Sequence, residues 1–233
     1  MANIYIVGTP IGNLEDLTFR AFNILRKVDF VLAEDTRKTK ILLDRYEIDP
    51  STSLGTSKLI SYHQHSKLTK VEYIIELLKS GKNLALVTDA GTPGISDPGN
   101  YLLEKIWEEK EKGLDVAIVP IPGASSLTSI LSVCGFPTDD FLFLGFLPKK
   151  KGRQTLFEKL KKEKTTIVFF ESPYRIEKTL RELEKYLGNI EVVVGRELTK
   201  KFEEIVRGNL IEVIKQLEKK NQKGEFVVVL NNR

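Results

Sequence analysis

The chain alternates short apolar runs with longer segments in which apolar residues recur every three or four positions. Short apolar runs predict buried strands, and the longer segments predict amphipathic helices. In the first half, the predicted strands are residues 3–7, 30–33, 59–62, 84–87 and 116–119. The predicted helices between them are residues 17–27, 36–46, 68–79 and a segment that ends near residue 112. Strands that alternate with helices indicate an α/β domain with a mostly parallel sheet.

The pattern changes near Cys134, after which strands are more frequent and predicted helices fewer. The predicted strands of the second half are residues 141–145, 166–170, 192–194, 204–206 and 226–230. One helix should end near residue 164, and another should begin at Pro173 with Ser172 as its N-cap. This composition of elements predicts a mixed sheet. We therefore expect an α/β fold of two domains, residues 1–119 and residues 120–233.

The central feature of the first half is the loop that follows the predicted strand 84–87. Three glycines and two prolines lie between Gly91 and Gly99, and Asp97 and Pro98 should cap and open the next helix. In open α/β sheets, ligands bind at the carboxyl ends of the strands, and Asp89 offers a carboxylate there. The alternative is a tight strand-to-helix turn that binds no ligand.

Three other predicted strands also end in small or polar residues. The first runs into a glycine turn at residues 8–13, which lacks the Gly-Lys-Ser/Thr of a Walker A loop. The second delivers the polar run 34–39, which either faces a cleft or caps the next helix. The fifth opens into residues 120–126, whose small residues suit a carboxylate at a helix N-terminus.

Composition narrows the class of protein. Hydrophobic residues make up 41% and charged residues 29% of the 233, and no apolar run approaches the roughly 20 residues of a membrane span. The N-terminus lacks the pattern of a signal peptide, and one cysteine with two histidines argues against disulfides and zinc. We therefore expect a cytoplasmic protein without a bound metal.

The charge is distributed unevenly along the chain. Residues 1–140 hold 15 Lys and Arg against 19 Asp and Glu, whereas residues 141–233 hold 21 against 13. A basic half favours a polyanionic partner, but Lys- and Glu-rich surfaces also suit a heat-adapted protein. The sequence leaves both interpretations open.

Six motifs stand in one order, at residues 8–13, 34–39, 89–99, 122–126, 170–175 and 195–200. Together they resemble the tetrapyrrole methylase superfamily, and within it the branch that methylates ribosomal RNA. The resemblance implies S-adenosylmethionine as cofactor, bound between two α/β domains. It also implies a homodimer and a product, the 2′-O-methyl ether of a cytidine in the decoding region of small-subunit ribosomal RNA.

The resemblance also assigns residues to the cofactor and to the RNA. The expected cofactor residues are Pro10, Asp89, Ala90, Gly91, Pro93, Gly94, Ile95, Ser96, Ser125, Ser126, Phe146, Leu147 and Phe226. The expected RNA contacts are Lys38, His63, Lys149, Lys150, Lys151, Arg153 and Arg175. Such relatives carry a further C-terminal segment, whereas this sequence stops at Arg233, so the lysine cluster is of interest as its substitute.

Methyl transfer to a ribose oxygen requires alignment of the reacting atoms and a group that takes up the hydroxyl proton. We expect Glu171 or Asp35 to accept the proton, with Arg37 and Arg196 as positioning groups. Alternatively, Glu171 and Arg196 pair with each other and stabilise the second domain. Two other functions stay open: methylation of a tetrapyrrole or another small metabolite, and RNA binding without catalysis.

Overall fold

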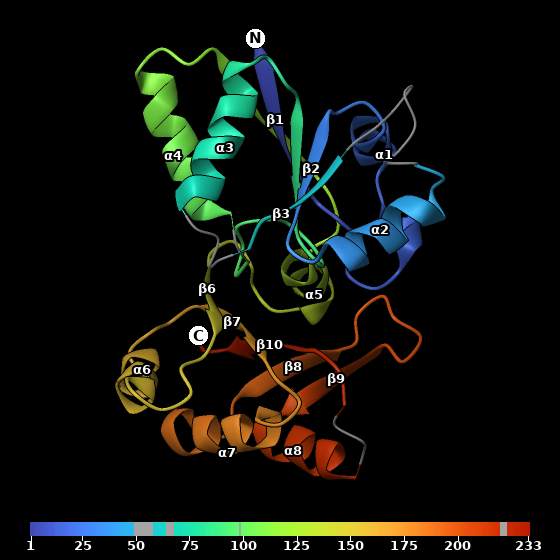
Figure 1. Cartoon of the computed structure of the whole chain (residues 1–233). Coiled ribbons are helices and arrows are strands. Elements are labelled where there is room, and N and C mark those ends of the chain that lie inside the picture. The colour runs from blue at the N-terminus through green and yellow to red at the C-terminus, as the bar shows by residue number, and fades with distance from the viewer. Residues whose placement is uncertain (49–57, 64–67, 98, 220–222) are drawn as a thin grey trace. The chain divides into compact units, whose positions relative to one another are not determined.

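The computed structural model describes residues 1–48, 58–63, 68–97, 99–219 and 223–233. The chain divides into two compact units, Met1–Ser125 and Ser126–Arg233 (Figure 1). The division falls six residues after the predicted boundary at 119. Residues 120–125 pack with the first unit, because the backbone of Gly123 lies against that of Gly8 and the Thr18 hydroxyl donates to the Pro122 carbonyl oxygen.

The first unit contains an all-parallel sheet. Its elements are β1 (Ala2–Val7), a 3-10 turn (Leu14–Asp16), α1 (Phe19–Leu25), β2 (Phe30–Ala33), α2 (Thr36–Arg45), β3 (Lys58–Ser61), α3 (Leu68–Lys79), β4 (Leu84–Val87), α4 (Asn100–Glu111) and β5 (Val116–Ile121). The strand order is β3-β2-β4-β1-β5, and every neighbouring pair is parallel.

Helices cover both faces of this sheet (Figure 1). α3 and α4 share one apolar core with the strands, and α1 and α2 share the other. A sheet that is buried on both faces explains why Leu84–Val87 is a continuous apolar run. Because the strands are parallel, the carboxyl ends of β1, β2 and β4 lie next to one another at one edge.

The second unit contains the mixed sheet that the sequence predicts. Its elements are α5 (Ser126–Cys134), β6 (Phe141–Phe146), α6 (Arg153–Leu160), β7 (Thr166–Glu171), α7 (Ile176–Leu187), β8 (Glu191–Arg196), β9 (Glu204–Asn209), α8 (Leu210–Glu218) and β10 (Phe226–Asn231). The strand order is β6-β7-β10-β8-β9, with β6 parallel to β7 and the other pairs antiparallel.

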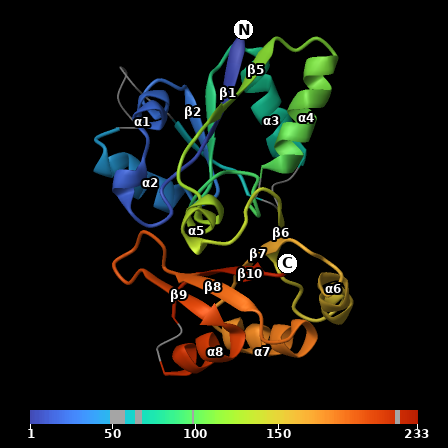
Figure 2. The ribbon, with the colours of Figure 1, turned by 180° about the vertical axis from the view of Figure 1, so that it is seen from behind.

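The two faces of the second sheet are covered differently (Figure 2). α6, α7 and α8 bury one face in a single core. α5 lies on the opposite face, where the Ile130 side chain lies so close to Gly195 that a Cβ there would be 2.8 Å from it. No helix in the described ranges is long and apolar enough to cross a membrane.

Three details of the helices differ from the prediction. α4 has Gly99 as its N-cap, so the assignment of Asp97 was wrong, and Pro98 lies outside the described residues. Ser172 does not cap α7, because a turn precedes the helix and Arg175 is the N-cap. α8 was missed, although its capping box of Asn209 and Glu212 is readable in the sequence.

Candidate functional site

The loops after β1 and β4 are joined at the carboxyl edge of the first sheet. Thr9 and Gly91 exchange two backbone hydrogen bonds of 2.9 and 3.1 Å. The buried Thr9 hydroxyl donates to the Thr88 carbonyl oxygen at 3.1 Å. Gly91 has a φ of +85°, which glycine adopts without steric cost. These contacts anchor the start of the β4–α4 loop, residues 88–99.

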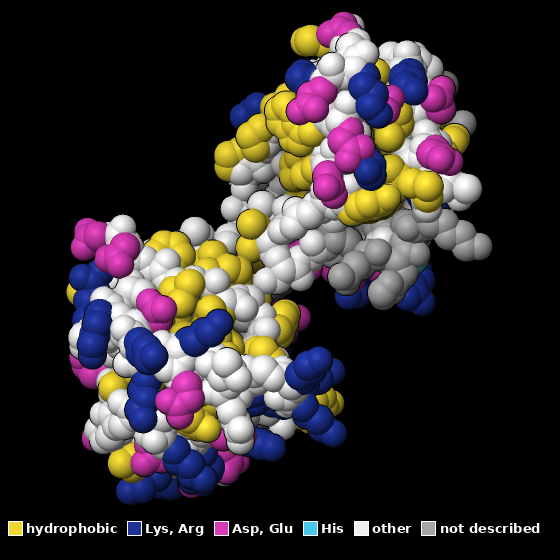
Figure 3. Space-filling model, turned by 90° about the vertical axis from the view of Figure 1, so that its left-hand side faces the viewer, with side chains coloured by type: hydrophobic (Ala, Val, Ile, Leu, Met, Phe, Trp, Pro, Cys, Tyr) yellow, Lys and Arg dark blue, Asp and Glu magenta, His cyan; other side chains and the backbone are white. Residues whose placement is uncertain are grey.

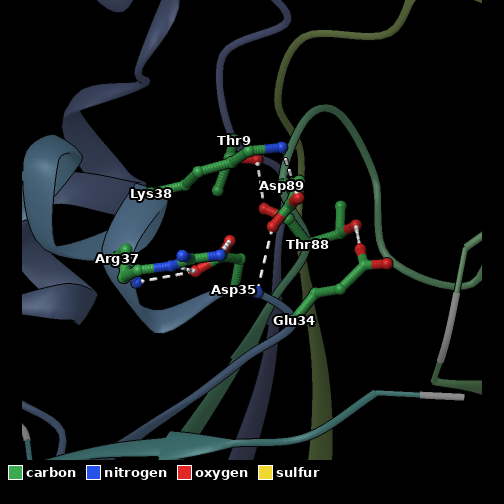
Figure 4. Close-up of polar contacts among 7 residues, drawn as sticks. All are labelled: Thr9, Glu34, Asp35, Arg37, Lys38, Thr88 and Asp89. Carbon is green, nitrogen blue, oxygen red and sulfur yellow. Dashed lines mark hydrogen bonds and ion pairs between the residues drawn. The ribbon is translucent and has the colours of Figure 1, made fainter. Parts of the chain in front are cut away.

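Asp89 links this loop to the end of β2. Its carboxylate accepts hydrogen bonds from the Asp35 N–H at 3.0 Å and from Lys38 Nζ at 2.7 Å (Figure 4). The bond to Asp89 raises the pKa of Lys38 above its ordinary value. The Thr88 hydroxyl donates to the Glu34 carboxylate at 2.9 Å. The ends of β1, β2 and β4 thus form one polar cluster.

Asp35 is the N-cap of α2. Its carboxylate accepts from the Arg37 N–H at 2.9 Å and from the Arg37 guanidinium at 2.7 and 3.0 Å. The side-chain and backbone hydrogen bonds of Arg37 lower the pKa of Asp35 to about 2. A carboxylate with so low a pKa binds a proton weakly near neutral pH. The structure therefore disfavours Asp35 as the proton acceptor and gives it the capping role that was the alternative.

The expected cofactor residues of the first unit gather at this edge but differ in exposure. Ala90, Ile95 and Ser96 are exposed, and Asp89 is half-buried. Pro10, Gly91 and Pro93 are buried, and Gly94 and Ser125 are half-buried. The loop thus presents exposed residues beside a carboxylate, an arrangement that fits the polar part of a cofactor.

Among the expected cofactor residues of the second unit, Phe146 and Leu147 lie at the end of β6, Phe226 begins β10, and Ser126 begins α5. Phe146 ends β6 with 58% of its surface exposed, and its ring contacts that of Phe170 edge-on. Leu147 and Phe226 are buried in the core beneath α6–α8. The side chains of these two residues therefore have packing roles.

Glu171 is the centre of a polar network inside the second unit. Its fully buried carboxylate pairs with Arg175 at 2.6 Å and accepts hydrogen bonds from the Ser172 N–H at 2.7 Å and the Thr179 hydroxyl at 2.8 Å. Arg153 donates to the same Thr179 hydroxyl at 2.7 Å and pairs with Glu182 at 2.7 Å. Because Glu171 is buried and engaged on both oxygens, the structure disfavours it as a proton acceptor.

The arginines of this network also hold the loop after β6. Arg175 donates to the Leu147 carbonyl oxygen at 3.2 Å, and Arg153 donates to the Pro148 carbonyl oxygen at 2.9 Å. Arg153 is buried. These two arginines therefore support the fold, a role that the expectation of RNA contacts did not include.

Arg196 does not pair with Glu171, so that alternative was wrong. Its guanidinium lies 3.7 Å from Glu204 and donates to the Lys223 carbonyl oxygen at 2.8 Å. Next to it, Glu197 has a φ of +50° and accepts from the Glu225 N–H at 2.9 Å. Arg196 thus connects β8 to β9 and to the segment before β10.

The other expected RNA contacts are mostly at the surface. Lys149, Lys150 and Lys151 are exposed in the loop before α6, and His63 is exposed after β3. Lys38 is exposed too, but its ammonium is held by Asp89. The lysine cluster and His63 therefore stay as proposed contacts.

Sequence reasoning left several residues of these clusters unassigned, among them Thr9, Glu34, Thr88 and Thr179. Thr9, Glu34 and Thr88 lie in or next to the quoted motifs, so their position at strand ends was a usable signal. Thr179 lies on the apolar stripe of α7, where a polar residue must find a buried partner.

These features, a doubly covered parallel sheet with a glycine-rich loop after β4 and a second mixed α/β unit, define a known class. The chain belongs to the family of Tetrapyrrole (Corrin/Porphyrin) Methylases, whose model matches residues 3–214. It is a methyltransferase with S-adenosylmethionine as its cofactor.

Particular relatives narrow the comparison. The chain is 48% identical to the ribosomal RNA small subunit methyltransferase I of Thermotoga maritima over 233 residues, which is 100% of both chains. It is 45% identical to the protein of the same name from Bacillus subtilis over 99% of this chain and 75% of that one. Both relatives are curated proteins.

Solved structures share the fold at low sequence identity. The crystal structure of diphthine synthase has a TM-score of 0.70 at 14% identity, covering 99% of this chain and 90% of that one. Cobalt precorrin-4 methyltransferase has a TM-score of 0.64 at 20% identity, covering 97% and 94%. These similarities confirm the fold class and leave the substrate to other arguments.

Proposed function

We propose that this protein transfers the methyl group of S-adenosylmethionine to the 2′ oxygen of a cytidine in the decoding region of small-subunit ribosomal RNA. The observation that carries the proposal is the 48% identity to ribosomal RNA small subunit methyltransferase I of Thermotoga maritima over the full length of both chains. The alternative of a small-metabolite substrate has weaker support, because the solved structures share only the fold with this chain, at 14% to 20% identity.

In this proposal the β4–α4 loop binds the methionine and ribose parts of the cofactor. The exposed residues Ala90, Ile95 and Ser96, with the Asp89 carboxylate, supply acceptors and donors for those polar parts. The exposed ring of Phe146 flanks the adenine. S-adenosylmethionine supplies an electrophilic methyl group, and the residues of this chain hold the acceptor oxygen in line with it.

We assign positioning roles to Asp35 and Glu171 instead of proton transfer. Each carboxylate forms an ion pair with an arginine, Asp35 with Arg37 and Glu171 with Arg175. Glu34 accepts a hydrogen bond from Thr88 and has no basic partner at ion-pair distance among the described side chains. In the proposal Glu34 takes up the hydroxyl proton, while Arg37 orients the RNA backbone.

The proposal includes the context in which the enzyme works. The exposed lysines 149–151 and His63 contact RNA phosphates, and the enzyme acts in the cytoplasm as a homodimer, as the family resemblance implies. Light scattering during size-exclusion chromatography tests the dimer, for which we expect twice the mass of the chain.

The experiment that tests the function is transfer of labelled methyl from S-adenosylmethionine to unmethylated small ribosomal subunits, compared with naked ribosomal RNA. We expect label on one ribose hydroxyl of a cytidine, located by mapping the modified nucleotide. Cofactor binding without transfer to either substrate overturns the proposal and favours a small-metabolite methylase. RNA binding without cofactor binding favours the non-catalytic alternative.

A further inference from the structure

Tyr174 is the most exposed large apolar side chain in the described residues, with 96% of its surface accessible. Its backbone is nevertheless fixed. Pro173 precedes it, and the Arg175 and Ile176 N–H groups both donate to the Ser172 carbonyl oxygen, at 3.0 and 3.1 Å. Exposure of an aromatic ring on a fixed turn costs hydrophobic free energy, which a binding role would recover.

Tyr174 lies in the turn just before α7 and continues a stripe along the outer face of that helix. Lys178, Arg181 and Lys185 follow at spacings of four, three and four residues, which place side chains on one face of a helix. These four residues, with Glu177 and Glu182, line an open recess of about 400 Å³. The recess is polar, unlike the mostly apolar and enclosed pockets that hold small ligands.

The charges in this recess leave a positive excess. Glu177 pairs with Arg181 at 3.0 Å, and Glu182 pairs with Arg153 at 2.7 Å. Arg181 also contacts Glu218. Lys178 and Lys185 are exposed, and neither has an acidic partner at ion-pair distance among the described side chains.

The lysine loop of residues 149–151 lies beside this stripe. The carbonyl groups of Leu147 and Pro148, just before the loop, are held by Arg175 and Arg153. Arg153, just after it, binds Thr179 and Glu182 of α7. Figure 3 shows many Lys and Arg side chains, with Asp and Glu between them, on one face of the second unit. The exposed ring therefore shares a recess with Lys178, Arg181 and Lys185, in which Glu177 and Glu182 are paired with arginines.

An exposed aromatic ring among cations is the arrangement that binds unpaired nucleotides, because bases stack on the ring and phosphates meet the cations. We propose that the Tyr174 ring stacks on an unpaired base of the substrate RNA, while Lys178 and Lys185 bind the adjoining phosphates. This inference rests on the proposed function, and it adds a contact surface to the lysine loop.

The test compares full-length wild type with Y174A, Y174F and Y73A by fluorescence anisotropy on a single-stranded RNA oligonucleotide of the decoding region. Tyr73 is a matched control, since it is a half-exposed tyrosine on α3 of the first unit. We expect Y174A to raise the RNA Kd roughly ten-fold, since stacking on one ring is worth about 1–3 kcal/mol. Y174F and Y73A should bind like wild type.

Salt dependence separates stacking from charge. Y174A should leave the slope of log Kd against log salt unchanged, because the ring carries no charge. K178A/K185A should reduce the magnitude of that slope by about 1.4, at about 0.7 for each phosphate contact to a single strand. K215A, which removes an exposed lysine of α8, should leave it unchanged.

Each remaining outcome has a definite meaning. If wild type methylates the RNA and Y174A binds within about two-fold of wild type, the stacking inference is overturned and the proposed function stands. Loss of binding in Y174F as large as in Y174A also overturns it, because the hydroxyl and not the ring would then matter. If wild type does not bind this oligonucleotide but methylates small ribosomal subunits, the stacking inference is overturned and the proposed function stands. If wild type methylates neither subunits nor naked ribosomal RNA, the proposed function fails and this inference fails with it.

Discussion

Glu34 and Asp35 are adjacent carboxylates at the end of β2, and their partners give them different chemistry. Asp35 is held by Arg37, which lowers its pKa to about 2, whereas Glu34 accepts a hydrogen bond from Thr88. We expect E34Q to reduce the rate of methyl transfer about 100-fold or more, the range of a lost general base. D35N, which keeps an N-cap residue, should reduce it less than about ten-fold. The measurement is single-turnover transfer at saturating cofactor, and the reverse order of effects would assign the proton to Asp35.

The pKa of Asp35 also predicts how stability depends on pH. The folded-state pKa of about 2 lies below the ordinary value of 3.8, so the folded state favours the charged form. The resulting stabilisation is present above pH 4 and is lost as the pH falls from about 4 towards 2. We expect the difference in unfolding free energy between wild type and D35N to shrink over this range in denaturant titrations. A difference in unfolding free energy that stays constant with pH would show that the ion pair between Asp35 and Arg37 does not stabilise the folded state.

Gly94 and Gly81 form a matched pair of glycines with φ of +84° and +80°. A Cβ on Gly94 would lie 2.7 Å from Asn100 Oδ1, whereas a Cβ on Gly81 meets nothing within 4 Å. G94V should lower affinity for S-adenosylmethionine at least about ten-fold, because the new side chain displaces that of Asn100, which donates to the Gly94 carbonyl oxygen, and occupies the surface of the β4–α4 loop. G81V should cost similar backbone strain, about 1–2 kcal/mol, and leave that affinity unchanged. Calorimetric titration of both variants measures this, and equal affinities would move the cofactor away from the loop.

At the scale of elements, the turns after β1 and β5 pack backbone against backbone. A Cβ on Gly8 would lie 2.8 Å from Gly123 Cα, and a Cβ on Gly123 would lie 2.6 Å from the Gly8 carbonyl oxygen. The small residue at 123 thus serves contact with the neighbouring turn. Sequence reasoning took it as space for a ligand, because one chain read in order does not show which turns meet.

This contact predicts that a single methyl group added to either turn destabilises the first unit. G8A and G123A should each lower the unfolding free energy of the first unit by about 1–3 kcal/mol, the usual cost of overpacking. G208A is the control, because its Cβ would meet the flexible carboxylate of Glu212 at 3.0 Å. Chemical denaturation measures all three variants. Wild-type stability in G8A would mean that the two turns separate at little cost.

The strands and helices were predictable from the sequence where the local pattern of apolar residues determines them. Each strand of the parallel sheet was found within two residues at either end, because a strand buried on both faces is a continuous apolar run. α8 was missed, although Gly208 follows the predicted strand 204–206 and the capping box of Asn209 and Glu212 marks the start of the helix. Glu171 was predicted to be a proton acceptor, but its partner Thr179 depends on packing between segments that the sequence does not reveal.

At the scale of the whole molecule, the balance of charged residues differs between the two units. The first unit holds 15 Lys and Arg against 17 Asp and Glu, and the second holds 21 against 15. The sequence left two explanations, a polyanionic partner and a heat-adapted surface. The ion pairs of the described residues differ between the two groups of lysines. Lys79 and Lys112 both bind Glu109, as the heat-adapted surface would require. Lysines 149–151 have no acidic partner at ion-pair distance among the described side chains, as the polyanionic partner would require.

These two groups of lysines therefore make a matched test. K149A/K150A/K151A should reduce the magnitude of the RNA-binding salt slope by about 2, at about 0.7 for each phosphate contact, and change stability by less than about 0.5 kcal/mol. K79A/K112A should leave the slope unchanged and lower stability slightly, by the few tenths of a kcal/mol that an exposed pair contributes. Anisotropy across a salt series and thermal unfolding measure both effects. A slope that the triple variant leaves unchanged would make the cluster a solvated surface, and the basic second unit would then need another explanation.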